Sequence, residues 1–571
     1  MNKKVLALSL VTIIYLISSI TGLILFFMVS EPDLPEEITL VFGTMYGPVY
    51  LDPQVAWDRA SISAIDQVCE GLFAYNLSDP ELVIIPNLAL SGTWNPAGTE
   101  FTCVLRQGVT FHDGATFDAD AVIFTWDRMA WALNTTGTNT DDVTQVAEFY
   151  GFPNGTPIVK DVIKNGDYSV TFELNGPYIP FEALLCFSAS YILSPTSTPA
   201  MAYIDTATGD IVGTGPFVYD NYEVGYNVTF HAFDDYWKSR AQIDKLIFSI
   251  ISDANARNAA LLSGEIDILT NPLDSMFDIF NTTEGITLEE GPQDTVIQFL
   301  CMNNLKSNRT FREAISHAID YDYIIDELRL GNALRMKSPI PKGIKYANWS
   351  FNIPTYNLTH AREAMQSMGF GTGFNNSDDN EWINQTNYDP FAALNYTYIL
   401  GNEFRENMLI FLQENLEKIG IEVLDDWWSW DSWLLRMRWP WDDNYNYLNL
   451  YWNGWGADYN DPSNFINPLF TNRSTATNLA QYNGWLAAIE AGVNPHQINN
   501  NVQLLMEAAL EEVNSTRREK IYDRIQELLI ERDFPWAFGY VNRIFRAYAS
   551  DLRGYQLNPM RKEYYFPCYF A

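Results

Sequence analysis

The stretch LRQGVTFHDGATFDADAVIFTWDR, residues 105–128, carries the pattern that indicates the fold class. Residues 101–106, which overlap its start, alternate apolar and polar side chains and predict a half-buried strand. A turn rich in glycine follows at residues 107–114. Asp118 then stands where the N-cap of a helix belongs, and the apolar residues after it predict a helix that ends near Leu133. The stretch therefore predicts a strand–turn–helix unit.

The mixture of strands and helices continues along the chain. Further strands are predicted at residues 39–46, 170–174, 217–219, 228–232 and 245–250, and a helix at residues 255–263, ended by Gly264. Later helices are predicted at residues 311–318, 323–330, 359–368, 403–419 and 502–532. The apolar strands between them, residues 396–400 and 421–424, are typical of a partly parallel sheet. Residues 369–395, rich in Gly, Asn and Asp, are predicted to be a surface loop.

The composition excludes several classes of protein. With 571 residues, 47% of them hydrophobic, the chain is long enough for several compact units and is not disordered. Its formal charge of −36 would repel the phosphate backbone of a nucleic acid, so nucleic-acid binding is excluded. The five cysteines lie far apart, which excludes a zinc ribbon and a dense disulfide framework. One or two disulfides remain possible, and because the number of cysteines is odd, one thiol must be left unpaired.

The N-terminus predicts attachment to a membrane. Lys3 and Lys4 precede an uncharged stretch, residues 5–29. As a helix it would be about 37 Å long, more than the roughly 30 Å of a bilayer's hydrocarbon core. No small-x-small cleavage site follows, so an uncleaved anchor at residues 1–30 is favoured over a cleaved signal peptide. The lysines place the N-terminus in the cytoplasm and residues 31–571 outside the cell, as a single-pass membrane protein.

Sequons for N-glycosylation are more frequent than chance predicts. Chance gives roughly five N-x-S/T triplets in a chain of this composition. Thirteen occur, at Asn76, Asn134, Asn154, Asn227, Asn281, Asn308, Asn348, Asn357, Asn375, Asn384, Asn395, Asn472 and Asn514. The excess favours a glycoprotein with an extracellular surface, and the alternative is a chain that is merely rich in asparagine.

Enzyme signatures are missing from the sequence. It has no H-E-x-x-H, no P-loop and no G-x-S-x-G elbow, so we assign no catalytic residue, metal site or cofactor. His112 and Asp113 are adjacent on a predicted turn and are assigned a turn-stabilising role. A secreted hydrolase that uses a pair of carboxylates is an alternative, because Asp and Glu are plentiful, but no motif in the sequence indicates such a pair.

The densest feature is a group of indole rings. Eight of the 17 tryptophans fall within 29 residues, at Trp427, Trp428, Trp430, Trp433, Trp439, Trp441, Trp452 and Trp455. Such rings supply rigid contact area with a polar N–H group, which suits the wall of a ligand cleft. Packing inside the core is the rival interpretation.

Several blocks, taken together and in order, resemble a known family. They are LDP (51–53), EGL (70–72), residues 105–128, GTGPF (213–217), YW (236–237), LLSGEIDI (261–268), FREAISHAIDYDYII (311–325), EKIGIEV (417–423) and GWGADYNDP (454–462). The chain from about residue 38 to its end resembles the extracytoplasmic solute-binding proteins of ABC importers, of the dipeptide and oligopeptide class.

This resemblance implies an α/β, two-lobed periplasmic-binding-protein-like fold of type II, with the extra subdomain of the peptide-binding class. Lobe I would comprise residues 38–72, 191–295 and 536–571, with the extra subdomain at 73–190 and lobe II at 296–535. The ectodomain would be monomeric and would close on a solute between its lobes. The closed form would deliver the solute to permease subunits that work with a separate ATPase.

The resemblance also implies the binding residues. In peptide-binding members the aspartate of the ADY motif pairs with the ligand's α-ammonium, and the matching residue here is Asp458. Its alternative role is a turn or cap aspartate. The wall candidates are Trp455, Tyr459, Trp430 and Trp57.

Oligopeptides are therefore the expected ligands, and an oligosaccharide receptor or a surface-layer protein are the alternatives. No basic residue is matched to a ligand's carboxylate. Arg436 and Arg438 lie near the site in sequence only.

Overall fold

The computed structural model describes residues 37–135, 137–139, 149–152, 154–207, 209–400, 402–429, 432, 449–472 and 477–571. Leu40–Ala571 form one compact unit. The predicted membrane anchor, residues 1–30, lies outside the described residues, as does Trp430. Within the described ranges, no helix combines the length and the apolar character that crossing a membrane requires.

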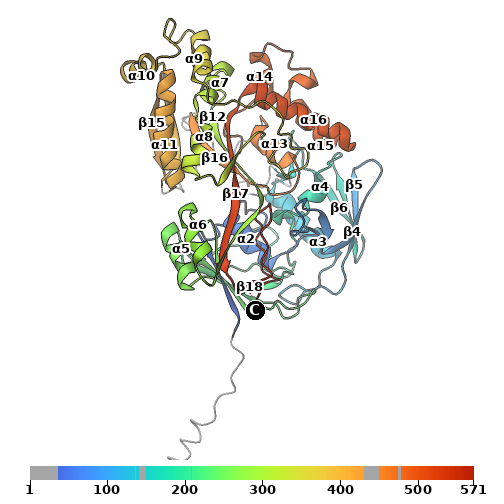
Figure 1. Cartoon of the computed structure of the whole chain (residues 1–571). Coiled ribbons are helices and arrows are strands. Elements are labelled where there is room, and N and C mark those ends of the chain that lie inside the picture. The colour runs from blue at the N-terminus through green and yellow to red at the C-terminus, as the bar shows by residue number, and fades with distance from the viewer. Residues whose placement is uncertain are drawn as a thin grey trace, which may run out of the picture. The chain divides into compact units, whose positions relative to one another are not determined.

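The largest sheet found among the described residues has 11 strands, in the order β15-β14-β16-β12-β17-β11-β1-β10-β9-β8, with β13 beside β17. The strands are β1 (Thr39–Thr44), β8 (Phe217–Glu223), β9 (Asn227–Ala232), β10 (Lys245–Ile250), β11 (Ile268–Leu269), β12 (Ile286–Met302), β13 (Ala333–Arg335), β14 (Ala392–Ile399), β15 (Ile421–Trp428), β16 (Leu450–Trp455) and β17 (Trp536–Ala549). The two longest, β12 and β17, pair antiparallel along the middle of the unit, with several shifts of register (Figure 1). β14 pairs in parallel with β15 and β16, which confirms the partly parallel sheet.

Helices flank both ends of this sheet (Figure 1). Beyond β14–β16 lie α7 (Arg309–Ala318), α8 (Tyr321–Tyr323), α9 (Leu358–Ser367), α10 (Asp379–Tyr388) and α11 (Glu403–Leu416), with α13 (Ser463–Phe470), α14 (Gly484–Glu490), α15 (Val502–Glu511) and α16 (Ser515–Glu527) beside them. At the opposite end lie α2 (Arg59–Val68), α5 (Ala254–Ser263) and α6 (Phe277–Thr282). Gly264 ends α5 with a left-handed φ of 75°, as the sequence predicted.

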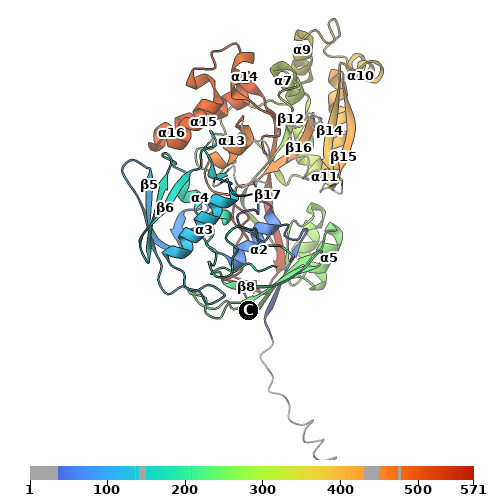
Figure 2. The ribbon, with the colours of Figure 1, turned by 180° about the vertical axis from the view of Figure 1, so that it is seen from behind.

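The stretch from which the fold class was inferred belongs to a second, smaller sheet. In the described chain this sheet has four strands, ordered β4 (Ala89–Trp94), β5 (Glu100–Leu105), β7 (Ser169–Leu174) and β6 (Val159–Gly166). α3 (Ala119–Ala132) packs on it, with the rings of Trp126 and Phe172 5.2 Å apart (Figure 2). The Asp118 carboxylate accepts hydrogen bonds from the N–H groups of Asp120 and Ala121. The predicted cap and helix are therefore confirmed.

Short elements complete the described chain. They are β2 (Phe73–Tyr75), β3 (Ile84–Pro86), α4 (Phe181–Leu184), β18 (Leu552–Arg553) and β19 (Tyr569–Phe570), with 3-10 and π turns between the longer helices.

Two of the sequence blocks meet at a buried ion pair. Asp52 of the LDP block and Arg128 at the end of α3 are each about 1% exposed, and the guanidinium binds the carboxylate through both terminal nitrogens. Asp52 also accepts a hydrogen bond of 2.8 Å from the Ile204 N–H. Because a buried charge is costly unless it is paired, this pair fixes three distant segments against one another.

Three further blocks meet at Glu70. Its carboxylate accepts hydrogen bonds from the Tyr236 hydroxyl at 2.9 Å, the Trp237 indole N–H at 2.8 Å and the Thr214 hydroxyl at 3.0 Å. Gly213 lies beside Thr214 in the GTGPF block, and a Cβ there would come within 2.1 Å of the Val68 carbonyl oxygen. The residues of these blocks thus contact one another and stabilise the fold.

Two predictions about the second half of the chain were wrong. Residues 369–395 are not a surface loop, because they contain α10, whose Trp382 is fully buried against Phe374 and Phe391. The predicted helix at residues 502–532 is two helices, because the Asn514 side chain caps a new one by accepting from the Arg517 N–H at 3.0 Å. Both segments are rich in polar residues, so the sequence did not indicate the helix α10 or the break between α15 and α16.

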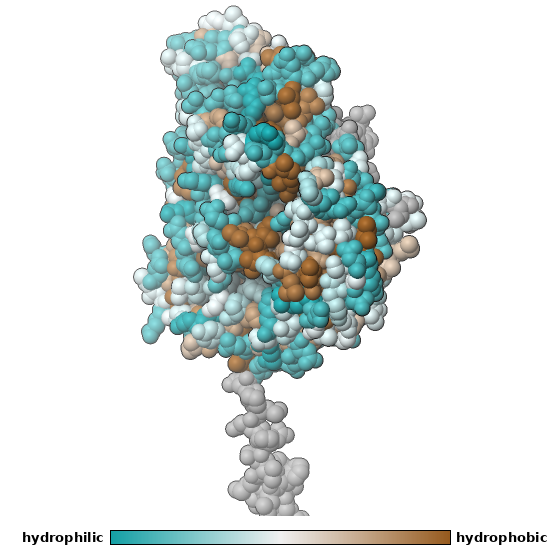
Figure 3. Space-filling view, turned by 90° about the vertical axis from the view of Figure 1, so that its right-hand side faces the viewer, coloured by the Kyte–Doolittle hydropathy of each residue, from teal (hydrophilic) through white to brown (hydrophobic). Residues whose placement is uncertain are grey.

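The cysteines form no cross-link. All five lie in the described part of the chain, and all are buried free thiols, so the option of one or two disulfides is not realised. Burial raises the pKa of Cys69 and of Cys103. The surface is mostly hydrophilic on the face shown in Figure 3, where apolar groups form separate patches.

Candidate functional site

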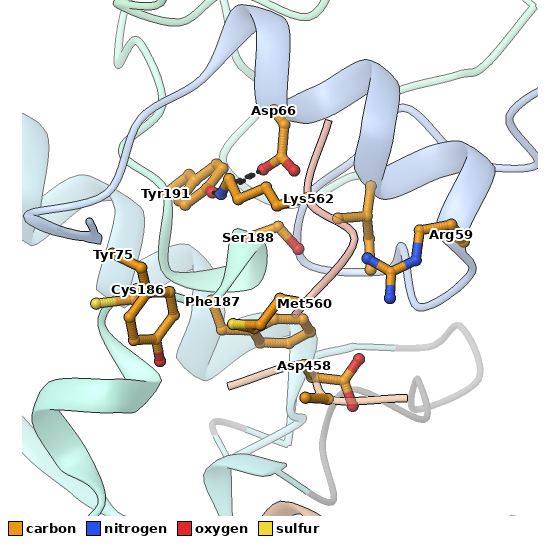
Figure 4. A pocket seen from close by; sticks show the side chains of 12 residues that line it. Arg59, Asp66, Tyr75, Cys186, Phe187, Ser188, Tyr191, Asp458, Met560 and Lys562 are labelled. Carbon is orange, nitrogen blue, oxygen red and sulfur yellow. Dashed lines mark hydrogen bonds and ion pairs between the residues drawn. The ribbon is translucent and has the colours of Figure 1, made fainter. Parts of the chain in front are cut away.

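A small cavity lies where segments far apart in the sequence meet (Figure 4). Its walls are Arg59, Ile62 and Asp66 from α2, Tyr75 from β2, Cys186, Phe187, Ser188 and Tyr191 after α4, Ala457 and Asp458 after β16, and Met560 and Lys562 near the C-terminus. Its volume is about 30 Å³. Small-molecule sites usually measure roughly 300–1,000 Å³. In this conformation the cavity therefore holds a group of the size of water or an ammonium, and a larger solute needs the surrounding segments to separate.

Asp458 is the carboxylate at one side of this cavity. Asn464 Nδ2 donates to its Oδ2 at 3.0 Å, and the Asp458 N–H donates to Asn464 Oδ1 at the same distance. Within the described residues it forms no ion pair. Burial raises the pKa of Asp458 to about 6, against the opposing effects of the Asn464 hydrogen bond and the more distant Arg59 charge. The effect of burial on this pKa therefore outweighs the two opposing effects.

The other side of the cavity is already neutralised (Figure 4). Lys562 Nζ lies 2.8 Å from Asp66 Oδ1, and the Tyr191 hydroxyl donates to the same oxygen at 2.7 Å. Lys562 also contacts the Tyr191 hydroxyl and lies 5.0 Å from the centre of that ring. Asp66 therefore has its charge and its lone pairs satisfied by the protein itself.

Arg59 is the second cation at the cavity. It is the first residue of α2, where Asp58 caps the helix by accepting from the Ser61 N–H at 2.9 Å. Its guanidinium forms no ion pair among the described residues, and it passes close to Gly456, where a Cβ would lie 3.4 Å from Arg59 Nη2. The site therefore presents one anion, Asp458, and one exposed cation, Arg59, which attract each other but form no ion pair in the described chain.

The predicted wall residues occupy other places. Tyr459 is 1% exposed, and its ring lies 6.2 Å from that of Phe149. Trp455 is half-buried at the end of β16, with its indole N–H donating to the Asn464 carbonyl at 2.9 Å and its ring 6.2 Å from Phe149. Trp57 is half-buried against the largest core cluster. Asp458 lines the cavity, Trp455, Tyr459 and Trp57 are not among its lining residues, and Trp430 lies outside the described residues.

Sequence reasoning missed Arg59, Lys562 and Tyr191. The one local signal was a cap residue, Asp58, followed directly by a base at the start of a helix. Nothing in the sequence indicates that the C-terminal segment with Lys562 returns to α2. The rejected pair His112–Asp113 serves the fold, as predicted: Asp113 accepts from the Ser194 and Ser197 hydroxyls at 2.6 Å each, and His112 contacts the Gly215 carbonyl at 2.9 Å.

Comparisons with known proteins identify relatives of this chain. A family model described as "Bacterial extracellular solute-binding proteins, family 5 Middle" matches residues 83–477. The chain is 25% identical to the "Dipeptide-binding protein" of Escherichia coli (strain K12), over 92% of this chain and 94% of that protein. It is 24% identical to the "Heme-binding protein A" of Haemophilus influenzae, over 91% of this chain and 90% of that protein.

A solved structure shares the fold. The periplasmic binding protein DppA from Helicobacter pylori, in complex with the peptide STSA, superposes with a TM-score of 0.78 at 23% identity. The superposition covers 93% of this chain and 98% of that one. It confirms the α/β periplasmic-binding-protein fold for the described part of the chain.

Proposed function

Because this chain belongs to the family 5 extracellular solute-binding proteins, we propose that it captures oligopeptides and delivers them to the permease of an ABC importer. Membership of the family confirms the resemblance deduced from the sequence blocks. The protein is an extracytoplasmic receptor for a small solute, serves an ABC transporter and is not an enzyme. Peptides as its solute are our proposal.

The unpaired carboxylate of Asp458 carries this proposal. Asp66 and Asp461 are paired with Lys562 and Arg518, whereas Asp458 keeps a desolvated charge that faces the cavity. An α-ammonium group fits a space of about 30 Å³ and would neutralise that charge through a charge-assisted hydrogen bond. A peptide's N-terminus supplies such a group, while neutral sugars have none.

Arg59 extends the proposal to the other end of a short peptide. A guanidinium with no ion-pair partner in the described chain binds a carboxylate through two parallel hydrogen bonds. The ligand would therefore be fixed by its termini or by an acidic side chain, and its other side chains would be only loosely selected. Among the described residues, Trp455 and Tyr459 do not line the cavity, so they give the sugar alternative no added support.

We also propose how the chain is divided and placed. Lobe I comprises residues 38–72, 191–295 and 536–571, the extra subdomain 73–190 and lobe II 296–535. Residues 1–30 anchor the protein in the membrane, with residues 31–571 outside the cell and some of the sequons glycosylated. Solute between the lobes selects the closed form, which the permease recognises.

The test measures peptide affinity by calorimetry, with ligands taken from the pool that native mass spectrometry finds bound to the purified full chain. We expect Asp458→Ala to weaken binding by about 2–5 kcal/mol, because a buried charge pair is broken. N-acetylation of the same peptide should weaken binding of the wild type equally and should not weaken binding of Asp458→Ala further. Asp326→Ala, at an exposed carboxylate, is the matched control.

Two results would contradict the proposal. Unchanged affinity of Asp458→Ala, with the control also unchanged, would remove Asp458 from the site. Hexose-spaced masses or a porphyrin in the co-purified pool would replace peptides as the solute while leaving the receptor's family membership intact.

A further inference from the structure

A group of metal-ligating side chains lies far from the cavity, between α7 and α9 at the end of the unit opposite α2 (Figures 1 and 2). Glu313 and His317 are four residues apart on α7, so both project from one face of that helix. His360 comes from the first turn of α9. One ligand atom from each of these three side chains lies within 4.8 Å of the others.

Backbone contacts hold this group in position. The Asn357 N–H donates to the His317 carbonyl at 2.8 Å, which ties the start of α9 to the end of α7. The Asn357 side chain then caps α9 by accepting from the His360 N–H at 3.0 Å. His360 is therefore fixed over α7, where its ring centre lies 4.3 Å from that of His317.

The hydrogen bonds of this group leave His317 Nε2 free, and the hydrogen bond between His360 Nε2 and Glu313 Oε1 is the contact that a bound ion would replace. His317 Nδ1 lies 2.8 Å from the Thr355 carbonyl oxygen, an acceptor, so Nδ1 carries the proton and Nε2 keeps its lone pair. This is how metal-binding histidines are usually oriented. Arg309 approaches the other carboxylate oxygen of Glu313, Oε2, at 3.7 Å, while Oε1 faces His360.

The spacing fits a tetrahedral ion. His360 Nε2 lies 3.3 Å from Glu313 Oε1. Two ligands bonded at about 2.0–2.1 Å to one tetrahedral zinc ion are separated by about 3.3 Å. Two of the three ligand atoms thus have the required separation, and the ligand atom of His317 lies within 4.8 Å of both. The His360 side chain is 44% exposed, so an ion can enter from solvent.

We propose that Glu313, His317 and His360 form a binding site for a divalent first-row transition-metal ion. Two imidazoles and one carboxylate suit zinc, copper or nickel rather than magnesium or calcium, which prefer oxygen ligands alone. Three protein ligands leave a fourth position for water, as in open zinc sites. The ion clamps α7 to α9 and so stabilises this end of the protein independently of peptide binding.

The experiment titrates Zn²⁺ into the chelator-treated full chain by calorimetry. We expect one site per chain that His317→Ala, His360→Ala and Glu313→Gln each weaken at least tenfold. His231→Ala, at an exposed histidine of β9, and Asp458→Ala should bind Zn²⁺ as the wild type does. Peptide binding should be unchanged in the three site variants, which shows that they are folded.

Zinc-edge X-ray absorption on the wild type gives a second readout that needs no variant. We expect imidazole scattering in a shell at about 2.0–2.1 Å. A shell of oxygen ligands alone, or Zn²⁺ affinity unchanged in both histidine variants, would overturn the proposal.

Discussion

The hydroxyl oxygen of Tyr75 accepts a hydrogen bond of 2.9 Å from the backbone N–H of Asn460, a residue 385 positions further along the chain. Tyr75 lines the cavity from β2, and Asn460 follows Asp458 by two residues. Asn460 Nδ2 also donates to the Glu81 carbonyl at 3.1 Å. These bonds join the two sides of the cavity and hold it at its small volume.

Replacing Tyr75 by Phe should loosen this closed arrangement. The variant loses one net hydrogen bond across the cavity, worth about 0.5–1.5 kcal/mol. Under the proposed mechanism, in which the ligand selects the closed form, peptide affinity should fall about two- to twelvefold. Calorimetry measures the affinity, and small-angle X-ray scattering with and without peptide measures closure.

Tyr226→Phe, at an exposed tyrosine, is the control and should change neither quantity. Tyr75 also donates to the Ala183 carbonyl at 3.2 Å, so urea unfolding of the variant separates a loss of stability from a loss of closure. If both affinity and scattering match those of the wild type, the Tyr75–Asn460 bond does not contribute to closure.

Peptide binding should weaken as the pH falls through 6. Burial raises the pKa of Asp458 to about 6, so its carboxylate is mostly ionised at pH 7 and mostly protonated at pH 5. The α-ammonium of a peptide stays protonated throughout this range. Affinity should therefore drop about tenfold from pH 7 to pH 5, as calorimetry at several pH values would measure.

Asp458→Asn should bind weakly with no such dependence on pH. His112 does not interfere, because burial lowers its pKa to about 4 and keeps it neutral over this range. A wild-type profile that is flat between pH 7 and pH 5 would mean that Asp458 does not contact the ligand's charge.

The same carboxylate should cost the unliganded protein stability as the pH rises above 3.8, and this cost should reach its full value above pH 6. Its pKa is raised from the ordinary 3.8 to about 6, so the folded state holds a proton that the unfolded state has already released. The resulting loss of free energy of unfolding is at most about 3 kcal/mol, and less because the side chain keeps some contact with solvent. Asp458→Asn should therefore be more stable than the wild type at pH 7.5, by urea unfolding.

This gain should shrink as the pH falls below 6, because the wild-type carboxyl then becomes neutral as well. If the free energy of unfolding of Asp458→Asn exceeds that of the wild type by the same amount at pH 7.5 and pH 4.5, the charge of Asp458 is not the cause of the gain. The tradeoff between affinity and stability at one residue is common at binding sites.

Two neighbouring arginines on α16 should differ strongly in their effect on stability. Arg518 donates to both carboxylate oxygens of Asp461 at 2.8 Å, in a pair less than a tenth exposed. Arg518→Met leaves Asp461 buried without a partner, and the free energy of unfolding should fall by about 3–5 kcal/mol. Arg517 pairs with Glu512 at the surface, so Arg517→Met should change little in the same urea titration.

Local patterns in the sequence predicted elements well where the cause was local. Asp118 and Gly264 marked helix ends because capping depends on one side chain or one backbone conformation. The loop predicted at residues 369–395 failed because one buried ring, that of Trp382, stabilises a helix whose exposed face is polar. The average composition of a segment does not reveal one buried side chain of this kind.

The sequons show how one pattern can have two causes. Several of these asparagines use their side-chain oxygen within the fold. Asn308, Asn357 and Asn514 cap helices, and Asn76, Asn154, Asn348 and Asn375 each accept from the N–H two residues on. Asn-x-Ser/Thr is also a good turn and cap sequence, so the excess reflects local structure in part. Glycosylation stays a prediction.

The candidate site was predicted only in part because its members meet through long-range packing. Asp458 was found through its motif. Its role in the cavity depends also on Arg59 and Lys562, which lie far away in sequence, toward opposite ends of the chain. The tryptophan cluster was a weaker guide, since indoles serve cores and clefts equally well. Only the folded structure shows which carboxylate lacks an ion-pair partner.

The position of β17 between β11 and β12 has a consequence for biosynthesis. This central strand begins at Trp536, and Met560 and Lys562 of the cavity follow it, so the ribosome makes the middle of the sheet and one wall of the cavity last. A nascent chain can form local units such as the β4–β7 sheet with α3, but it cannot complete the binding site during translation. Chains whose translation stops before Lys562 therefore lack part of the cavity wall and should not bind ligand.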